Sequence, residues 1–340
     1  MDASKLKPND SRVKHETVQI RGKTYSYMIG EPQGTPVDTM LLIHGFPDIG
    51  FGWRNQIPHF MSLGFRVIVP DMVGYAGTDA PQDLGAYSLK SISTDMKELV
   101  SKYVGDDGQI VLGGHDWGGF LVWRMVLWYP ELIKGVFSVC TPYRAPSKQY
   151  VPLESAIAAG RFTHFAYQLQ LAGPEVEEKI QGEEKIRQFL NGMYGGAGAN
   201  GKAAFEVTSG VLFDNLSSLS HTKMLSKEEL DYYVEQYMRR DAPQMRGPLN
   251  WYRTRKLNFD EELPLAEKGV KVEKPALFIL ATKDNALPRS LSEGMDKEFA
   301  NLTTREVESS HWALWQVPDA VNQQITEWLK DISGGMKSNL

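Results

Sequence analysis

The feature that most constrains the fold is an alternation of short apolar runs with helical segments. The runs at 39–45, 65–71 and 109–114 are apolar throughout and are closed by turn residues, and helix-like segments lie between them. Strands that are apolar on both sides are typical of a parallel sheet covered by helices on its two faces. The sequence therefore predicts an α/β core.

The alternation stops after residue 141 and resumes near residue 270. The intervening 142–269 contains helix-like pieces and a glycine-rich break but no clear strand, and strand character returns at 275–281. We expect an opening hairpin around a Gly22-Lys23 turn, a helix after Pro288 and a final helix. The layout predicts a mostly parallel, doubly wound sheet. Its core domain comprises 1–141 and 270–340, and 142–269 forms an inserted helical cap domain, a plan close to the α/β-hydrolase fold.

Composition and charge exclude several classes of function. The formal net charge of -5 gives no basic surface for nucleic acid or anionic lipid. Cys140 is the only cysteine, so an internal disulfide and a cysteine metal cluster are excluded. No span reaches roughly 18 consecutive apolar residues, and the first residues are too polar for a secretory signal. We expect a soluble cytoplasmic protein, as a monomer or homodimer, without a membrane anchor; the terminal "SNL" only loosely matches a peroxisomal signal.

The stretch "GGHDWGG" at 113–119 has the form of a nucleophile elbow with Asp116 at its centre. Gly114 and Gly118 flank Asp116 by two positions, where a sharp turn from strand to helix leaves no room for side chains. A helix beginning at Trp117 would favour an anion at its N-terminus. The alternative is that Asp116 only caps this helix, a common position for aspartate.

Chain order supplies two partners for Asp116. On this fold the nucleophile is followed by an acid and then by a histidine, and both occur after the later strands: Asp284 after 275–281, and His311 after the last strand. Each has an ordinary alternative, since Asp284 could be a turn residue and His311 a buried histidine beside Trp312. The agreement of all three positions favours a catalytic set.

The "HGFP" segment, His44 to Pro47, predicts an oxyanion hole formed by the backbone N–H groups of Phe46 and Trp117. Its alternative is a tight Gly-Pro turn, and a cis bond before Pro47 is expected. His44 and His115 are poorer candidates for the base because of their positions in the loop and in the elbow. The spacing of the remaining histidines does not suit a metal site; they are His15, His59, His164 and His221. No metal or cofactor is expected.

An aspartate nucleophile changes the chemistry that the elbow can perform. With an ordinary pKa of roughly 3.9, Asp116 is ionised at neutral pH and needs no base. It can attack an sp³ carbon to give an ester, which His311, oriented by Asp284, would hydrolyse by activating water. Epoxides and alkyl halides both suit this scheme.

Beyond these positions, the motifs "HGFP", "PDMVGYAGTDAP", "GGHDWGG", "KDNALP" and "SHWAL" resemble those of the α/β-hydrolase-fold epoxide hydrolases across nearly the whole core. The resemblance implies an eight-stranded sheet and an enzyme, used in detoxification, that converts an apolar or aryl epoxide and water to a vicinal diol. It also implies that two cap tyrosines, Tyr167 and Tyr252, donate to the epoxide oxygen. Phe46, Trp117, Tyr167, Tyr252 and Trp312 would line the pocket.

Two departures from the family pattern are small. Ser310 stands where glycine often precedes the histidine, and Val73 stands where a basic residue often precedes "GY". Neither removes a chemical group that the mechanism requires.

Two other functions compete with epoxide hydrolysis. Haloalkane dehalogenases share the fold and "HDWG", but the position of Phe46 usually holds an asparagine that binds halide, and Phe46 has no side-chain donor. Fluoroacetate dehalogenases place arginine after the nucleophile, where this chain has Trp117. A non-catalytic binding protein of this fold would need no complete set of nucleophile, acid and base.

Overall fold

The computed structural model describes residues 2–332. Within that range one large sheet has the strand order β1-β2-β4-β3-β5-β6-β9-β10. The first two neighbouring pairs are antiparallel and the others are parallel. The strands are β1 (Lys14–Ile20), β2 (Lys23–Gly30), β3 (Asp38–Ile43), β4 (Phe65–Pro70), β5 (Ile110–His115), β6 (Ile133–Val139), β9 (Ala276–Ala281) and β10 (Leu302–Val307).

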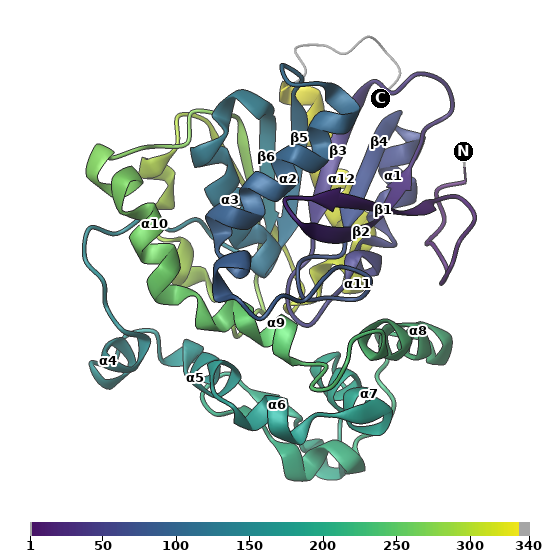
Figure 1. Cartoon of the computed structure of the whole chain (residues 1–340), viewed down its shortest axis with the longest axis vertical. Helices are drawn as coiled ribbons and strands as arrows, with labels where there is room; N and C mark the ends of the chain where they lie inside the picture. Colours follow the sequence, from purple (N-terminus) through teal and green to yellow (C-terminus); the bar gives the residue numbers. More distant parts are fainter. Residues whose placement is uncertain (1, 333–340) are drawn as a thin grey trace.

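The central strands are buried along almost their whole length because helices cover both faces of the sheet. Helices α1 and α12 pack together on one face, and α2 and α3 pack together on the other (Figure 1). The helices of this part are α1 (Gln56–Ser62), α2 (Leu89–Val104), α3 (Trp117–Trp128), α11 (Ala313–Gln316) and α12 (Pro318–Ile332). The prediction of a mostly parallel, eight-stranded α/β-hydrolase sheet is confirmed.

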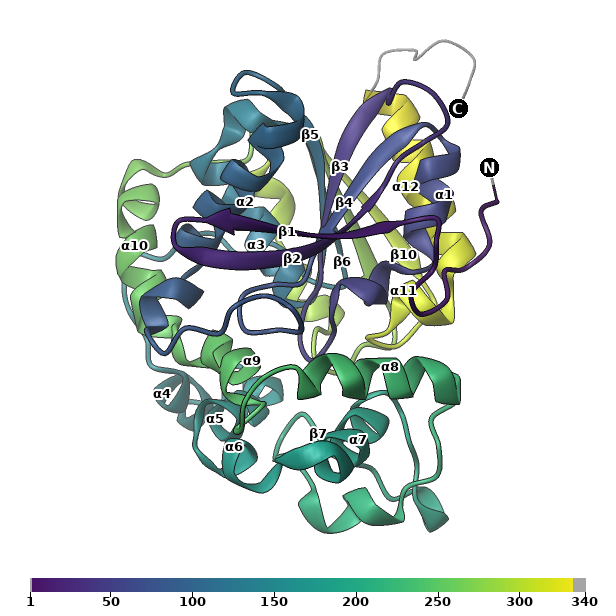
Figure 2. The ribbon, with the colours of Figure 1, turned by 45° about the vertical axis from the view of Figure 1, so that its right-hand side comes forward.

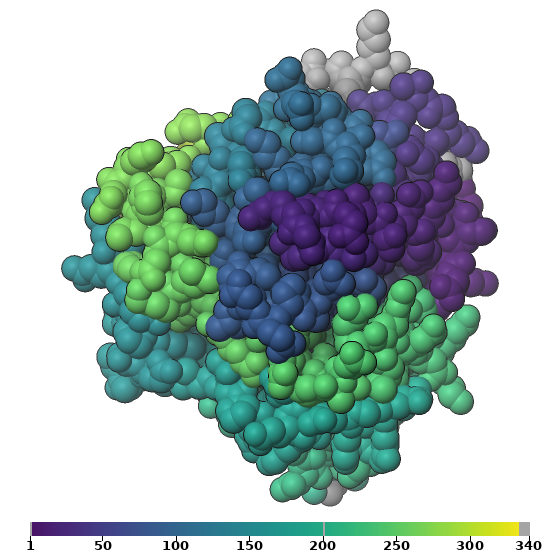
Figure 3. Space-filling view, in the orientation of Figure 1, coloured from purple at the N-terminus to yellow at the C-terminus, as the bar shows by residue number. Residues whose placement is uncertain are grey.

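Between β6 and β9 the chain is mainly helical; α4 to α9 form a layer beneath the sheet, and α10 runs up the side of the core (Figures 1 and 2). On the face seen in Figure 3 this teal and green layer lies directly against the purple and blue part of the molecule. Its α-helices are α4 (Leu153–Ala158), α5 (Tyr167–Ala172), α6 (Glu175–Lys179), α7 (Gly182–Met193), α8 (Lys227–Met238), α9 (Arg246–Asn250) and α10 (Arg255–Lys268). The division into a core domain and a cap domain at 142–269 stays a prediction.

Three local features differ from the expectation. The opening hairpin turns at Arg21 and Gly22, one residue earlier than expected, because both have the positive φ that a two-residue hairpin turn requires. A two-stranded pair, β7 (Phe205–Glu206) and β8 (Gly210–Val211), interrupts the helical layer. The segment after Pro288 forms two short 3-10 helices rather than one α-helix, because Glu293 is extended and ends the first, and Gly294, with a φ of 76°, precedes the second.

A search of residues 2–332 finds no helix with the length and apolar character to cross a bilayer. The terminal tripeptide considered as a peroxisomal signal lies outside the described residues.

Candidate active site

The elbow is a strained turn that only glycine neighbours can accommodate. Asp116 has φ 55° and ψ −122°, between the end of β5 and the start of α3. A Cβ on Gly114 would lie 2.3 Å from the carbonyl oxygen of Gly118, and a Cβ on Gly118 would lie 2.1 Å from that of Ile43. The Thr141 hydroxyl donates to the Asp116 carbonyl at 2.7 Å and supports this costly conformation.

The Asp116 carboxylate is directed toward the loop after β3, His44 to Pro47, rather than toward its own helix. Its side chain makes no capping bond to α3, whereas its Oδ1 accepts the backbone N–H of Phe46 at 2.7 Å. A Cβ on Gly45 would lie 2.3 Å from the same oxygen, so this close approach requires glycine. The Phe46–Pro47 peptide bond is cis, as expected. The capping alternative for Asp116 is therefore disfavoured.

His311 lies between the two carboxylates. Its Nδ1 is 2.7 Å from Asp284 Oδ2, and its Nε2 is 3.4 Å from Asp116 Oδ2. The other Asp284 oxygen accepts the backbone N–H groups of Ala286 and Leu287. Both oxygens of Asp284 are therefore hydrogen-bonded, which sets the orientation of the carboxylate. The carboxylate in turn fixes the orientation of the His311 ring.

The charges of this set are strongly coupled. Burial alone would lower the pKa of His311, but the charge of Asp284 and the bonds to both carboxylates raise it to about 10. Burial alone would raise the pKa values of Asp116 and Asp284, but His311 lowers both below their usual range. The free site is therefore an imidazolium between two carboxylates at neutral pH.

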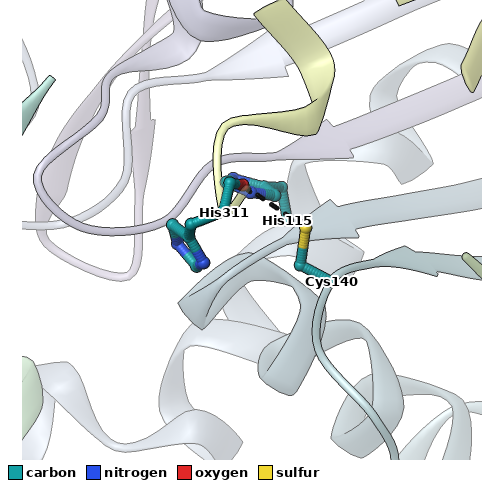
Figure 4. A group of neighbouring side chains, drawn as sticks. All are labelled: His115, Cys140 and His311. Carbon is teal, nitrogen blue, oxygen red and sulfur yellow. Dashed lines mark hydrogen bonds between the residues drawn. The ribbon is translucent and has the colours of Figure 1, made fainter. Parts of the chain in front are cut away.

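A second group of side chains anchors the backbone of His311 (Figure 4). His115 Nε2 is 2.8 Å from the His311 carbonyl oxygen, and the Cys140 thiol donates to the same oxygen at 3.3 Å. Burial and the nearby His311 lower the pKa of His115 to about 4, so His115 is neutral and its Nε2–H donates. The gathering of two histidines and a cysteine, which is a common metal-ligand set, is accounted for by this shared carbonyl acceptor.

The two candidate tyrosines come from the helical layer and lie close to the elbow. Tyr167 opens α5, and Tyr252 lies in the 3-10 helix η7 (Trp251–Arg253); their ring centroids are 6.4 Å apart. The Tyr252 ring meets the edges of Trp117 at 5.2 Å and Phe46 at 5.1 Å between centroids. Burial first, and then neighbouring charges that include Asp116, raise the pKa of both tyrosines, so their hydroxyls stay protonated.

One arginine joins the two segments that carry these tyrosines. Arg253 follows Tyr252 and donates to the carbonyl oxygens of Ala172 and Gly173, at the end of α5, at 3.0 Å each. It also donates to Glu177 in α6 at 2.8 Å. Because α5 begins with Tyr167, this network fixes the spacing of the tyrosine pair.

The fifth expected pocket residue has a different setting. The indole N–H of Trp312 donates to the Met193 carbonyl at 3.1 Å, and its ring stacks on Trp315 at 4.5 Å. Among the described residues its other ring contacts are with His115, His311 and Tyr194 rather than with the tyrosine pair. The structure thus brings Phe46, Trp117, Tyr167 and Tyr252 together, and a place for Trp312 in the pocket stays a prediction.

Sequence reasoning did not find the residues that support the set. The sequence marks Cys140 only as the single cysteine and Thr141 only as the end of the first core segment, although the side chains of both bond to backbone carbonyls of the site. Their hydroxyl and thiol sit directly after β6, beside the elbow, and that position is the only signal in the sequence that could have indicated them.

Comparisons with known proteins identify the family and the fold of the chain. A family model described as the alpha/beta hydrolase fold matches residues 38–318. The chain is 43% identical to Epoxide hydrolase srdG of Neurospora crassa over 97% of this chain and 99% of that one. It is 30% identical to Bifunctional epoxide hydrolase 2 of Mus musculus over 95% of this chain and 56% of that one. The crystal structure of Epoxide Hydrolase A from Mycobacterium thermoresistibile has a TM-score of 0.78 and 25% identity, over 94% of this chain and 98% of that one.

Proposed function

Because the chain belongs to the α/β-hydrolase family and, within it, to the epoxide hydrolases, we propose that it hydrolyses an apolar or aryl epoxide to a vicinal diol through an ester on Asp116. The observation that carries the mechanism is a partly buried carboxylate, Asp116, which lies beside His311 and whose charge acts on two protonated tyrosines. Small epoxides and water are the partners of this reaction, and no cofactor takes part.

In the first half-reaction an Asp116 oxygen attacks an epoxide carbon and the C–O bond to that carbon breaks. The electron pair of that bond goes to the epoxide oxygen, which takes a proton from Tyr167 or Tyr252. Because burial keeps both hydroxyls protonated, the developing alkoxide finds a donor in either position. The product is an alkyl ester of Asp116 and a tyrosinate.

In the second half-reaction water attacks the ester carbonyl. His311 takes the water proton while the N–H groups of Phe46 and Trp117 hold the oxyanion. The intermediate then collapses: the bond between the carbonyl carbon and the diol oxygen breaks, and that oxygen takes the proton from His311. The Asp116 carboxyl finally gives its own proton to His311, which restores the ion pair. Ester formation removes the Asp116 charge, which is one cause of the raised His311 pKa, so the imidazolium becomes more acidic at that step. Its proton can then return to the tyrosinate, leaving a neutral base for water.

The other functions have weaker support. Haloalkane dehalogenases usually hold a halide-binding asparagine where Phe46 stands, and the protonated hydroxyls of Tyr167 and Tyr252 suit an alkoxide that must gain a proton, which a halide does not need. A purely binding role gives no reason for His311 to be held between Asp284 and Asp116. We also propose that the enzyme is cytoplasmic and is a monomer or a homodimer.

Single turnover with a terminal aryl epoxide in water enriched in heavy oxygen tests the mechanism. Label should enter the Asp116 peptide and be nearly absent from the first diol released, because one diol oxygen comes from the epoxide and the other from Asp116. Label passing straight into that diol would mean direct attack by water.

The Asp116→Ala variant is the control for the labelling experiment, and it should fold and form no diol. Diol formation at the wild-type rate in this variant would show that the nucleophile is wrongly assigned. A parallel incubation with a haloalkane, with halide release as the readout, tests dehalogenation.

A further inference from the structure

The carbonyl of Pro47, next to the oxyanion donor Phe46, is held by hydroxyls from the helical layer. Tyr194, directly after α7, donates to this oxygen at 3.0 Å, and Tyr237 of α8 donates to it at 2.5 Å. On the same helix, Tyr233 donates to the Asp48 carboxyl at 2.7 Å. We call Tyr194, Tyr233 and Tyr237 the tyrosine clamp. All three are buried, with relative exposures of 0%, 0% and 2%.

The clamp acts on a segment whose position is critical. The Pro47 carbonyl lies in the same short segment as the Phe46 N–H, which is bonded to Asp116 Oδ1 at 2.7 Å, and the Phe46–Pro47 peptide unit separates the two groups. A shift of this segment moves the N–H relative to the Asp116 carboxyl. Two buried hydroxyls on one carbonyl satisfy both of its lone pairs, and leaving such a group without a partner is costly.

The same end of α7 also contacts the loop of the base. The carbonyl of Met193, the residue before Tyr194, accepts the indole N–H of Trp312 at 3.1 Å, and Trp312 follows His311 directly. The Tyr194 ring packs edge-on against Trp312, with centroids 5.0 Å apart. Met193, the last residue of α7, and Tyr194, which follows it, thus contact both the oxyanion loop, His44 to Pro47, and the loop that carries His311.

We propose that the tyrosine clamp is a positioning device that sets the Phe46 N–H for hydrolysis of the Asp116 ester; this rests on the proposed function. Tyr194 and Tyr237 touch no reacting atom and act through Pro47. Because the clamp residues come from the end of α7 and from α8, the oxyanion hole is effective only when these two helices are packed in their correct positions.

The two half-reactions should respond differently to loss of the clamp. Before attack, the Phe46 N–H stabilises the Asp116 carboxylate, which loses charge as the ester forms, so a weaker bond does not slow alkylation. During hydrolysis, negative charge develops on the ester carbonyl oxygen, and the same N–H stabilises the transition state more than the ester. A displaced N–H therefore slows the second step selectively.

The test is the double variant Tyr194→Phe/Tyr237→Phe, mixed with excess aryl epoxide and sampled by rapid quench. Intact-protein mass gives the esterified fraction, and diol release gives the overall rate. We expect ester hydrolysis to slow about tenfold, since complete loss of an oxyanion donor costs roughly 100-fold to 1000-fold, and the ester to accumulate. Alkylation should change less than about twofold.

Tyr232→Phe is the matched control, because Tyr232 is on α8 and its hydroxyl makes no hydrogen bond among the described residues; its kinetics should match those of wild type. The two single variants, each keeping one donor to Pro47, should be intermediate, and they serve as the test if the double variant does not fold. Ester hydrolysis at the wild-type rate in a folded double variant, or equal slowing of both steps, would overturn the proposed role of the clamp and would leave the proposed function standing. Failure of the wild-type enzyme to form an ester would overturn the proposed function itself.

Discussion

At the scale of single residues, the carboxylate at position 116 decides what His311 does. A serine there would need the histidine as its base, whereas Asp116 is already ionised and is paired with the imidazolium. In the proposed mechanism His311 is held in its protonated form and becomes a base only after ester formation has removed the charge of one of its two anionic partners. The charge of Asp116 therefore controls both steps: it makes Asp116 a nucleophile, and its loss on ester formation allows His311 to act as a base.

The dependence of His311 on Asp116 can be measured directly. In Asp116→Ala we expect the His311 imidazole to titrate well below the wild-type value of about 10, because one of the anionic partners that raise its pKa is gone while burial still lowers it. Titration of the imidazole resonances by NMR gives both values.

His15 on the edge strand β1 serves as the internal reference for the NMR titration. Burial and Arg239 lower its pKa, and neither cause changes in Asp116→Ala. An unchanged His311 titration beside an unchanged His15 would contradict the coupling.

At the scale of elements, two ends of the helical layer serve different steps. The α5 and η7 end carries Tyr167 and Tyr252, the proposed donors to the epoxide oxygen, and Arg253 joins these elements. The α7 and α8 end carries the tyrosine clamp on the oxyanion loop. Damage to one end should therefore slow alkylation, and damage to the other should slow hydrolysis.

The Arg253→Lys variant tests the first of these ends. Lysine keeps the charge but cannot reproduce the fork that contacts Ala172, Gly173 and Glu177 together. We expect alkylation to slow by about tenfold and ester hydrolysis to stay near wild type, because the spacing of the tyrosine pair changes while the oxyanion loop does not. Rapid-quench measurement of the two steps separates these effects.

The control for Arg253→Lys is Arg187→Lys, which alters an ion pair with Asp231 between α7 and α8 on the surface. It should leave both steps unchanged, since an exposed pair contributes little. Slower hydrolysis with normal alkylation in Arg253→Lys would refute the division between the two ends.

Elements whose pattern is local were predictable, and contacts between distant segments were not. The buried parallel strands follow from their continuous apolar runs, and Asp284 and His311 follow from chain order after β9 and β10. The side chains of Cys140 and Tyr194 donate to backbone carbonyls of residues far away in the sequence. Because every residue type has a backbone carbonyl, no sequence motif marks those contacts. The two-residue strands β7 and β8 are too short to leave a periodic pattern.

At the scale of the whole molecule, the site is a meeting point of segments far apart in sequence. The loops after β3, β5, β6, β9 and β10 converge at one end of the sheet, and the helical layer closes over them (Figure 2). The charges enclosed there contribute to folding as well as to catalysis. The pKa of His311, raised from 6.5 to about 10, links the stability of the entire fold to pH.

The sign of this link gives a test on the intact protein. A folded-state pKa above the unfolded value means that the contribution of His311 to stability is complete below about pH 6.5 and is lost as pH rises through about 10. Chemical unfolding of wild type and His311→Gln from about pH 8 to about pH 10.5 should show a difference in the free energy of unfolding that shrinks with increasing pH. Surface lysines and tyrosines titrate in both proteins and cancel. A difference that stays constant over this range would mean that His311 is not held as an imidazolium between Asp116 and Asp284.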